Sequence, residues 1–92
     1  MIVMAFFDDS DYEYLDIALS DFKKIETYQD EFFSWMFDKN NPHEYWVTVN
    51  GSKIGCAYGI EAYIDWMKLY HNVNVDRISP AIDVKDVPIL YF

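Results

Sequence analysis

Two turn-forming residues near the middle of the chain, Asn50 and Gly51, mark the clearest structural element of this sequence. They lie within EYWVTVNGSKIGCAYG, in which apolar and polar residues alternate on both sides of the turn. Alternation with a period of two is typical of strands, and Asn-Gly favours the tight turn that joins two antiparallel strands. We therefore predict a β-hairpin whose loop is either Asn50-Gly51 or Gly51-Ser52.

The same alternation predicts which face of the hairpin is core. In either register one face carries the same side chains, namely Val47, Val49, Ile54 and Cys56. We expect this face to be covered, and we expect Cys56 to be buried and chemically unreactive. Trp46 and Thr48 then point the other way, so Trp46 is exposed if no helix covers that second face.

Several other stretches have a clear strand or helix pattern. Short apolar runs over residues 2–7, 73–78 and 87–92 predict strands, and we expect the last run to pair at a sheet edge or beside the first. After Gly59, apolar residues recur at helical spacing opposite a polar side, which predicts an amphipathic helix. Its apolar stripe consists of Ile60, Tyr63, Ile64, Met67 and Tyr70.

Residues 11–25 allow two interpretations. Apolar residues at helical spacing favour a helix over 11–25, and the alternative is a strand over YEYLDIAL that forms a hairpin with residues 2–7. A second helix, or a continuation of the first, is predicted to begin at Thr27, whose spacing to Asp30 resembles a capping box. It is predicted to end at DKNNP, where Pro42 and the paired asparagines stop it.

Together these elements predict one domain over residues 1–92, of the α+β class. We expect a small, mainly antiparallel sheet of three to five strands packed against two or three helices. A hydrophobic content of 52% excludes a disordered chain. The apolar start MIVMAFF lacks a basic flank and is too short for a signal sequence or a membrane span, so we expect a soluble cytoplasmic protein.

The charge is unevenly distributed along the chain. The net charge is −9, and residues 1–44 hold eleven of the sixteen acidic residues but three of the seven lysines and arginines. Direct binding to nucleic acid or to an anionic membrane needs basic residues, so both are disfavoured. A basic protein partner is favoured, and the asymmetry suggests an acidic working face. A homodimer is compatible with this composition.

No pattern for catalysis, metal binding or cofactor binding stands out. Asp9, Asp11 and Glu13 match the odd positions of a calcium loop, but Tyr14 and Ser20 stand where that loop needs glycine and glutamate. The two histidines, His43 and His71, are not spaced with Cys56 as a zinc site requires, and we expect them to be solvated or to cap helices. Cys56 has no basic neighbour to activate its thiol. We therefore predict no enzyme, cofactor or metal.

The acidic and aromatic residues of the first half form the predicted partner-binding surface. Carboxylates can imitate the phosphates of a nucleic acid, and exposed tyrosine and tryptophan are common interface anchors that stack on arginine. Glu26 and Asp30, one helical turn apart, repel each other, which suggests a gain elsewhere. The surface comprises Asp8, Asp9, Asp11, Tyr12, Glu13, Tyr14, Asp16, Glu26, Asp30, Glu31 and Trp46.

In size, charge and acid-aromatic stretches such as DDSDYEYLD and YQDEFFSWMF, the chain resembles the small acidic anti-defence proteins of phages. That group includes DNA-mimic anti-restriction proteins and anti-CRISPR proteins. The resemblance implies a non-enzymatic inhibitor, acting in the host cytoplasm, of a restriction complex, a CRISPR effector or another nuclease. Two alternatives stay open: an immunity protein or antitoxin that neutralises a basic nuclease toxin, and a small metal-binding or enzymatic domain.

Overall fold

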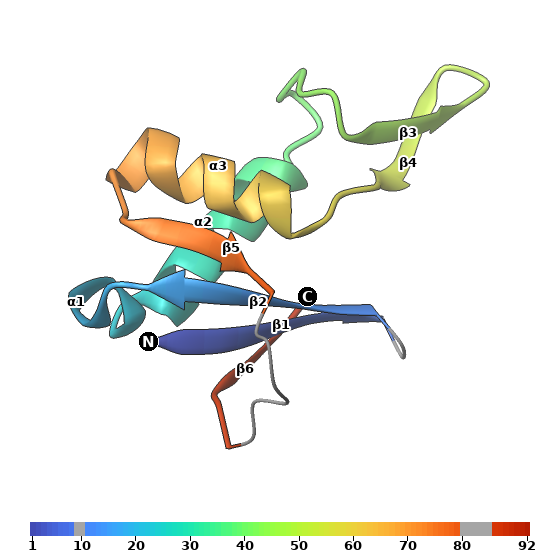
Figure 1. Cartoon of the computed structure of the whole chain (residues 1–92). Helices are drawn as coiled ribbons and strands as arrows, with labels where there is room; N and C mark the ends of the chain where they lie inside the picture. Colours follow the sequence, from blue (N-terminus) through green and yellow to red (C-terminus); the bar gives the residue numbers. More distant parts are fainter. Residues whose placement is uncertain (9–10, 80–85) are drawn as a thin grey trace.

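The main sheet has four strands in the order β5-β2-β1-β6 (Figure 1). The computed structural model describes residues 1–8, 11–79 and 86–92. β1 and β2 form a central antiparallel hairpin, β5 pairs antiparallel with β2, and β6 pairs parallel with β1. The strands are β1 (Ile2–Asp8), β2 (Asp11–Ile17), β5 (Val75–Ile78) and β6 (Ile89–Tyr91). A separate two-stranded sheet consists of β3 (Trp46–Val49) and β4 (Ser52–Cys56).

Three helices complete the α+β fold that the sequence predicts: α1 (Leu19–Phe22), α2 (Ile25–Met36) and α3 (Ile60–His71). α2 and α3 lie on one face of the main sheet (Figure 1). Side chains alternate between the faces of a strand, so every second residue reaches the core. The buried strand residues are Val3, Ala5, Leu15, Ile17, Val75 and Leu90. None of the helices in the described residues has the length and apolarity needed to cross a lipid bilayer.

The centre of the core is aromatic. Phe32 of α2 is fully buried, and its ring centroid lies 5.1 Å from that of Tyr63 and 5.7 Å from that of Trp66, both in edge-to-face contact. Phe92 stacks on Phe7 at 4.7 Å, so the residue after β6 packs on β1. Such pairs add to the stabilisation that buried area provides. Residues from both ends of the sequence therefore meet in one core.

The helix predicted over residues 11–25 is wrong, and the alternative hairpin is confirmed. Residues 11–17 form β2, in which Leu15 and Ile17 are buried two positions apart, at strand spacing. β2 pairs with β1 on one side and with β5 on the other. These non-local pairings outweigh the local helical spacing, because propensity is a weak prior against tertiary context. The predicted range keeps α1 and the first residue of α2 as helix.

The second predicted helix exists as α2 but begins before Thr27. Lys24 occupies the N-cap position and makes no side-chain capping bond, so the predicted capping box between Thr27 and Asp30 is absent. The helix after Gly59 is confirmed as α3, and its predicted stripe is buried except for Tyr70, which is 54% exposed. The late strands are confirmed as β5 and β6, and β6 lies beside β1 as one of the two predicted placements.

β3 and β4 form the predicted hairpin, which extends away from the body of the molecule (Figure 1). The φ angles of Asn50 and Gly51 are 53° and 79°, as a two-residue turn of the type favoured by Asn-Gly requires. The amide of Ala57 donates to the carbonyl of Tyr45 at 2.9 Å and joins the two residues that flank the strands, and Tyr45 and Cys56 pack against the core. The hairpin is therefore an arm held at its base.

The predicted core face of the hairpin is wrong for two reasons. First, its residues are solvent-facing because the arm stands clear of the body, with exposures of 40% for Val47, 50% for Val49 and 64% for Ile54. Second, a β-bulge leaves Ile54 without a partner on β3 and shifts the pairing of the residues that follow it. Cys56 therefore pairs with Trp46 and lies on the same face of the hairpin, whereas the alternation predicted opposite faces for these two residues. Cys56 is half-buried against the core.

Candidate functional site

The part of the predicted surface that lies on β2 is divided between two faces. Tyr12 and Tyr14 point away from the helices, with their rings in edge contact at 5.8 Å, and Asp16 shares that face. Glu13 points toward the helices, because neighbouring side chains of a strand alternate. Tyr12 is 52% exposed and Tyr14 is half-buried. Asp9 and the side chains of Asp8 and Asp11 lie outside the described residues.

Glu13 is engaged in an internal ion-pair network. Its carboxylate accepts two hydrogen bonds from Arg77 of β5, at 2.7 and 3.0 Å, and Arg77 also bonds Glu61 of α3. The hydrogen bonds from Glu61 and Glu13 raise the pKa of the Arg77 guanidinium above its usual value. Arg77 therefore links the sheet to α3, and the charge of Glu13 is compensated within the protein.

Two further predicted acids also have partners inside the protein. The carboxylate of Asp16 lies 3.1 Å from the amino group of Met1. The carboxylate of Glu31 on α2 lies 2.6 Å from Nε2 of His71, which is the last residue of α3. Exposed pairs of this kind stabilise a fold by at most about 1 kcal/mol. The amino group of Met1 offsets the charge of Asp16, whereas His71 offsets that of Glu31 only when its imidazole is protonated.

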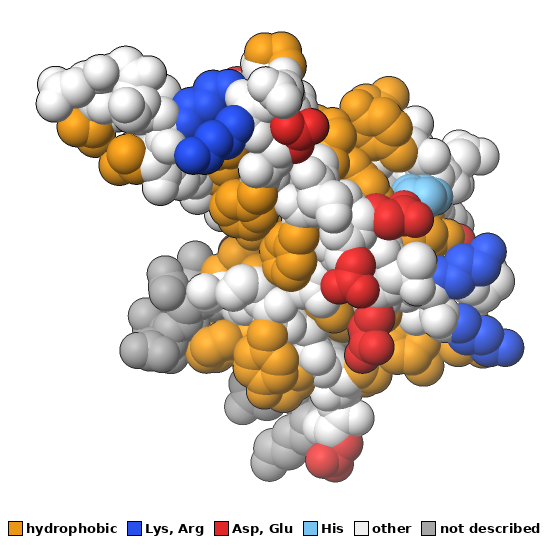
Figure 2. Space-filling view, turned by 180° about the vertical axis from the view of Figure 1, so that it is seen from behind, with side chains coloured by type: hydrophobic (Ala, Val, Ile, Leu, Met, Phe, Trp, Pro, Cys, Tyr) orange, Lys and Arg blue, Asp and Glu red, His pale blue; other side chains and the backbone are white. Residues whose placement is uncertain are grey.

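Glu26 and Asp30 are the predicted acids that remain unengaged. Both are exposed on α2, one helical turn apart, and neither forms an ion pair with a base in the described residues. Figure 2 views the molecule from the side on which α2 lies and shows acidic side chains spread across that face. The structure thus brings part of the predicted surface together on α2 and leaves Trp46 and the β2 residues elsewhere.

Trp46 is half-buried at the base of the arm, and is not the freely exposed ring that the alternation suggests. Its indole nitrogen donates to the carbonyl of Asn41 at 2.7 Å, and its ring stacks on His43. The ammonium group of Lys53 lies 5.0 Å from the centroid of the same ring. Trp46 is therefore packed by the chain itself on more than one side.

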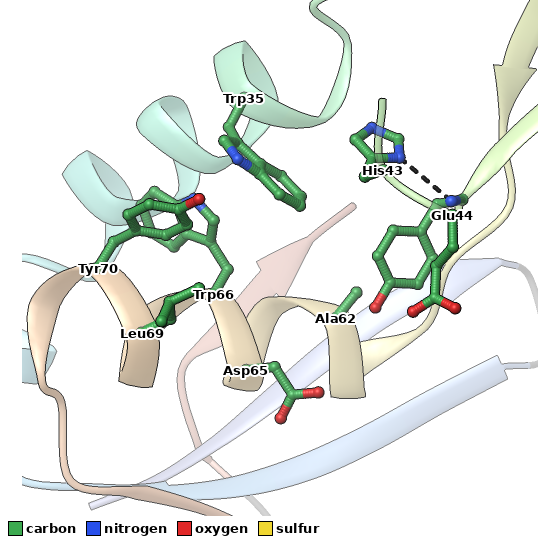
Figure 3. A pocket seen from close by; sticks show the side chains of 9 residues that line it. Trp35, His43, Glu44, Ala62, Asp65, Trp66, Leu69 and Tyr70 are labelled. Carbon is green, nitrogen blue, oxygen red and sulfur yellow. Dashed lines mark hydrogen bonds between the residues drawn. The ribbon is translucent and has the colours of Figure 1, made fainter. Parts of the chain in front are cut away.

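One cleft was not anticipated from the sequence. It has a volume of about 330 Å³ and lies between α3, the C-terminal part of α2 and the loop at residues 43–45 (Figure 3). We call it the α3 cleft, and its lining residues are Trp35, His43, Glu44, Tyr45, Ala62, Asp65, Trp66, Leu69 and Tyr70. Such a volume is at the lower end of the range for small-ligand sites.

Four aromatic rings and two carboxylates dominate the α3 cleft. The ring of Tyr70 lies 5.8 Å from that of Trp66 and 6.1 Å from that of Trp35. Burial raises the pKa of Tyr45, and the charges of Glu44 and Asp65 raise it further, which indicates that both carboxylates lie near this hydroxyl. In Figure 3 the carboxylates of Glu44 and Asp65 lie on the same side of the cleft.

One pattern in the sequence, not used in predicting the site, indicates a wall of this cleft. Ala62, Trp66 and Tyr70 recur every four residues and form a second stripe on α3, beside the stripe that faces the sheet. Because the sheet covers the first apolar stripe, the second stripe is left to pack against another part of the protein or a ligand. The loop from His43 to Tyr45 forms the opposite wall, and nothing local in the sequence predicts that placement.

Cys56 and His43 approach each other, but not as a catalytic pair. The thiol of Cys56 donates to the carbonyl of Met36 at 3.4 Å, and Nε2 of His43 bonds the same oxygen at 2.7 Å. Burial raises the pKa of the Cys56 thiol, which is the opposite of activation. His43 thereby caps the end of α2, as one of the predicted roles for the histidines. Within the described residues, no group of three or more potential ligand side chains is placed to hold a metal ion.

Comparison of the chain with models of protein families, with curated proteins and with solved structures finds no match.

Proposed function

We propose that this protein is a non-enzymatic inhibitor that binds a basic nucleic-acid-handling protein, such as a nuclease, a restriction complex or a CRISPR effector. The observation that carries the proposal is the pair of exposed carboxylates on α2, Glu26 and Asp30, which no described base neutralises. Like charges one turn apart repel each other and offset the favourable interaction of Glu26 with the N-terminus of α2, whereas a partner of opposite charge would stabilise both carboxylates. Such a partner meets nucleic acid inside the cell, which implies a cytoplasmic site of action.

The spacing of the acids on α2 supports mimicry of a nucleic acid. Glu26, Asp30 and Glu31 span about 7.5 Å of helix axis at about 1.5 Å per residue, an average of about 3.75 Å between neighbouring carboxylates. Glu31 also bonds His71. Along one strand of duplex DNA the phosphates lie about 3.4 Å apart, measured along the helix axis. A lysine- or arginine-lined groove that fits DNA would therefore meet charges on this helix at about the spacing of the phosphates of one strand.

The experiment that tests the proposal is affinity capture followed by competition. The purified protein is immobilised, exposed to bacterial lysate treated to remove nucleic acid, and the retained proteins are identified by mass spectrometry. We expect a nucleic-acid-binding protein that is released by added duplex DNA or RNA and by raised salt. A captured nuclease toxin would make the protein an immunity protein instead.

A matched pair of double variants sharpens the result. Glu26→Gln with Asp30→Asn removes the α2 charges, whereas Asp38→Asn with Asp86→Asn removes two exposed charges elsewhere and changes the net charge equally. The first variant is expected to lose the captured protein and the second to retain it. Equal retention by both variants, or a captured protein indifferent to nucleic acid, contradicts the proposal.

A further inference from the structure

We propose that the α3 cleft is a receptor for the guanidinium group of an arginine side chain presented by a partner protein. This inference deepens the proposed function, on which it rests for the existence of a basic partner. It assigns a specific contact that the α2 carboxylates do not provide. It stands on the shape of the cleft, on its aromatic walls and on the two carboxylates at its rim.

The walls of the cleft suit a planar cation. Trp35 and Trp66 face the cavity from α2 and α3, and Tyr70 lies against both rings (Figure 3). A cation over the face of tryptophan or tyrosine is attracted by the ring quadrupole, most strongly when it is partly desolvated. The cleft is predominantly apolar, so a cation that enters it loses part of its hydration.

The rim of the cleft supplies the counter-charge. Glu44 and Asp65 are both exposed, and neither forms an ion pair with a base in the described residues. The lining, taken over the part of the chain that the structure describes, includes no lysine and no arginine. An entering cation would therefore meet two carboxylates without having to displace an internal partner.

Arginine fits this chemistry better than the other candidates. Its guanidinium is planar, stacks on aromatic rings, is weakly hydrated and offers several donors to carboxylates. A lysine ammonium is strongly hydrated, and a quaternary ammonium has no donor for Glu44 or Asp65. An apolar side chain would fill the cavity, but it would desolvate both carboxylates without pairing them.

The surface next to the cleft can hold the rest of an arginine-bearing segment. Leu69 is 75% exposed at the edge of the cleft, and Tyr70 is 54% exposed. The aliphatic stem of arginine packs along apolar surface while its charged end bonds elsewhere. Leu69 and the exposed edge of Tyr70 offer that surface.

The test uses small probes and nuclear magnetic resonance, so it needs no identified partner. N-acetyl-arginine methylamide and its lysine and norleucine counterparts are titrated against isotope-labelled protein, and the three indole signals are followed. We expect the arginine probe to shift the signals of Trp35 and Trp66 more than that of Trp46, which does not line the cleft. The lysine probe should bind more weakly, and norleucine should have no comparable effect.

Variants at exposed positions make the result specific. Asp65→Asn should weaken the arginine probe about fivefold or more, because a charged hydrogen bond is roughly twice as strong as a neutral one. Asp38→Asn makes the same charge change outside the cleft and should leave binding unaltered. Circular dichroism establishes that both variants fold.

The outcomes separate this inference from the proposed function. Equal responses to arginine and norleucine, or full binding by Asp65→Asn, would show that the cleft is not a guanidinium receptor. The lysate capture that depends on Glu26 and Asp30 can still succeed in that case. Conversely, the arginine probe could bind in the cleft while lysate capture is unaffected by removal of the α2 charges. That result would support the guanidinium receptor and overturn the proposed function.

Discussion

The imidazole ring of His43 lies nearly parallel to the indole of Trp46, with 4° between the ring planes and 5.1 Å between the centroids. The ring of Trp35 on α2 stacks on the same imidazole at 5.0 Å. Since Nε2 of His43 also bonds the carbonyl of Met36, this histidine joins the base of the hairpin arm to the end of α2. The position of the arm therefore depends on these stacked rings.

Replacing Trp46 by alanine should loosen the arm. The change removes the ring stack and the bond to Asn41, and for a half-buried tryptophan we expect a cost of about 1–2 kcal/mol, below the 3–5 kcal/mol typical of buried large-to-small changes. Hydrogen exchange measured by mass spectrometry should accelerate over residues 46–56. Val49→Ala, at an exposed position of the arm, is the control and should change little. If hydrogen exchange over the arm is unchanged while partner binding is lost, Trp46 contacts the partner directly and does not hold the arm in place.

Neutralising Glu26 and Asp30 together should separate stability from binding. Removing a repulsive pair one turn apart should stabilise the helix by about 0.2–0.5 kcal/mol, but removing Glu26 from the first turn loses an interaction with the helix dipole of about 0.3–1 kcal/mol. The melting temperature should therefore stay level or fall slightly. Association with a basic partner should slow and become less sensitive to salt, because steering by charge is reduced. Stopped-flow or surface binding kinetics at two salt concentrations measure this. A faster or unchanged association rate would show that α2 does not steer the encounter.

Cys56 should react slowly with alkylating agents at neutral pH. Burial raises the pKa of its thiol, so the reactive thiolate is scarcer than for a free cysteine, and its fraction grows as the pH increases. Iodoacetamide labelling followed by mass spectrometry gives the rate, with the protein unfolded in guanidinium chloride as the fast reference. Rapid labelling of the folded protein at neutral pH, with loss of partner binding, would revive a reactive role for Cys56.

The buried hydroxyl of Tyr63 should make the fold sensitive to alkaline pH. It donates to the carbonyl of Ile25 at 3.0 Å, and burial raises its pKa well above the usual value. The unfolded chain ionises at the ordinary tyrosine pKa of about 10, so the stability from Tyr63 is intact below that pH and is lost as the pH rises above it.

The variant Tyr63→Phe tests this contribution. It loses one hydrogen bond, which should cost about 1 kcal/mol at neutral pH. Its melting temperature should then fall less steeply than that of the parent between about pH 9.5 and pH 11, because one titrating group is gone. Thermal unfolding followed by circular dichroism at several pH values provides the comparison. Parallel pH profiles for the two proteins would assign the alkaline sensitivity to other groups.

Elements with a local signal were the predictable part of this fold. The Asn50-Gly51 turn requires positive φ at both residues, and Asn-Gly is a dipeptide that strongly favours such a turn. The stripe beginning at Ile60 likewise describes a helix face within one segment. β2 was mistaken for a helix because its identity depends on hydrogen bonds to β1 and β5, which the sequence of residues 11–17 does not contain.

The predicted surface was recovered only in part for a similar physical reason. Charge could be counted from the sequence, but the pairing of Glu13 with Arg77 joins residues 64 positions apart. The bulge at Ile54, which changes the face of Cys56, arises from strand pairing and has no signal in the alternation. The α3 cleft combines residues from three segments, and only the aromatic stripe on α3 is visible as a pattern in the sequence.

The parallel pairing of β1 with β6 also determines when the protein can fold. Of the described strands, β1 comes first along the chain and its neighbour β6 comes last, and Phe7 gains its stacking partner only with Phe92. At about 5–20 residues per second, synthesis of the residues between β1 and β6 takes roughly 5 to 20 s, and the edge of β1 is uncovered for that time. An open apolar edge invites association with other chains during that interval. The core is therefore complete only when both β1 and β6 are present, and until then the edge of β1 stays open to other strands.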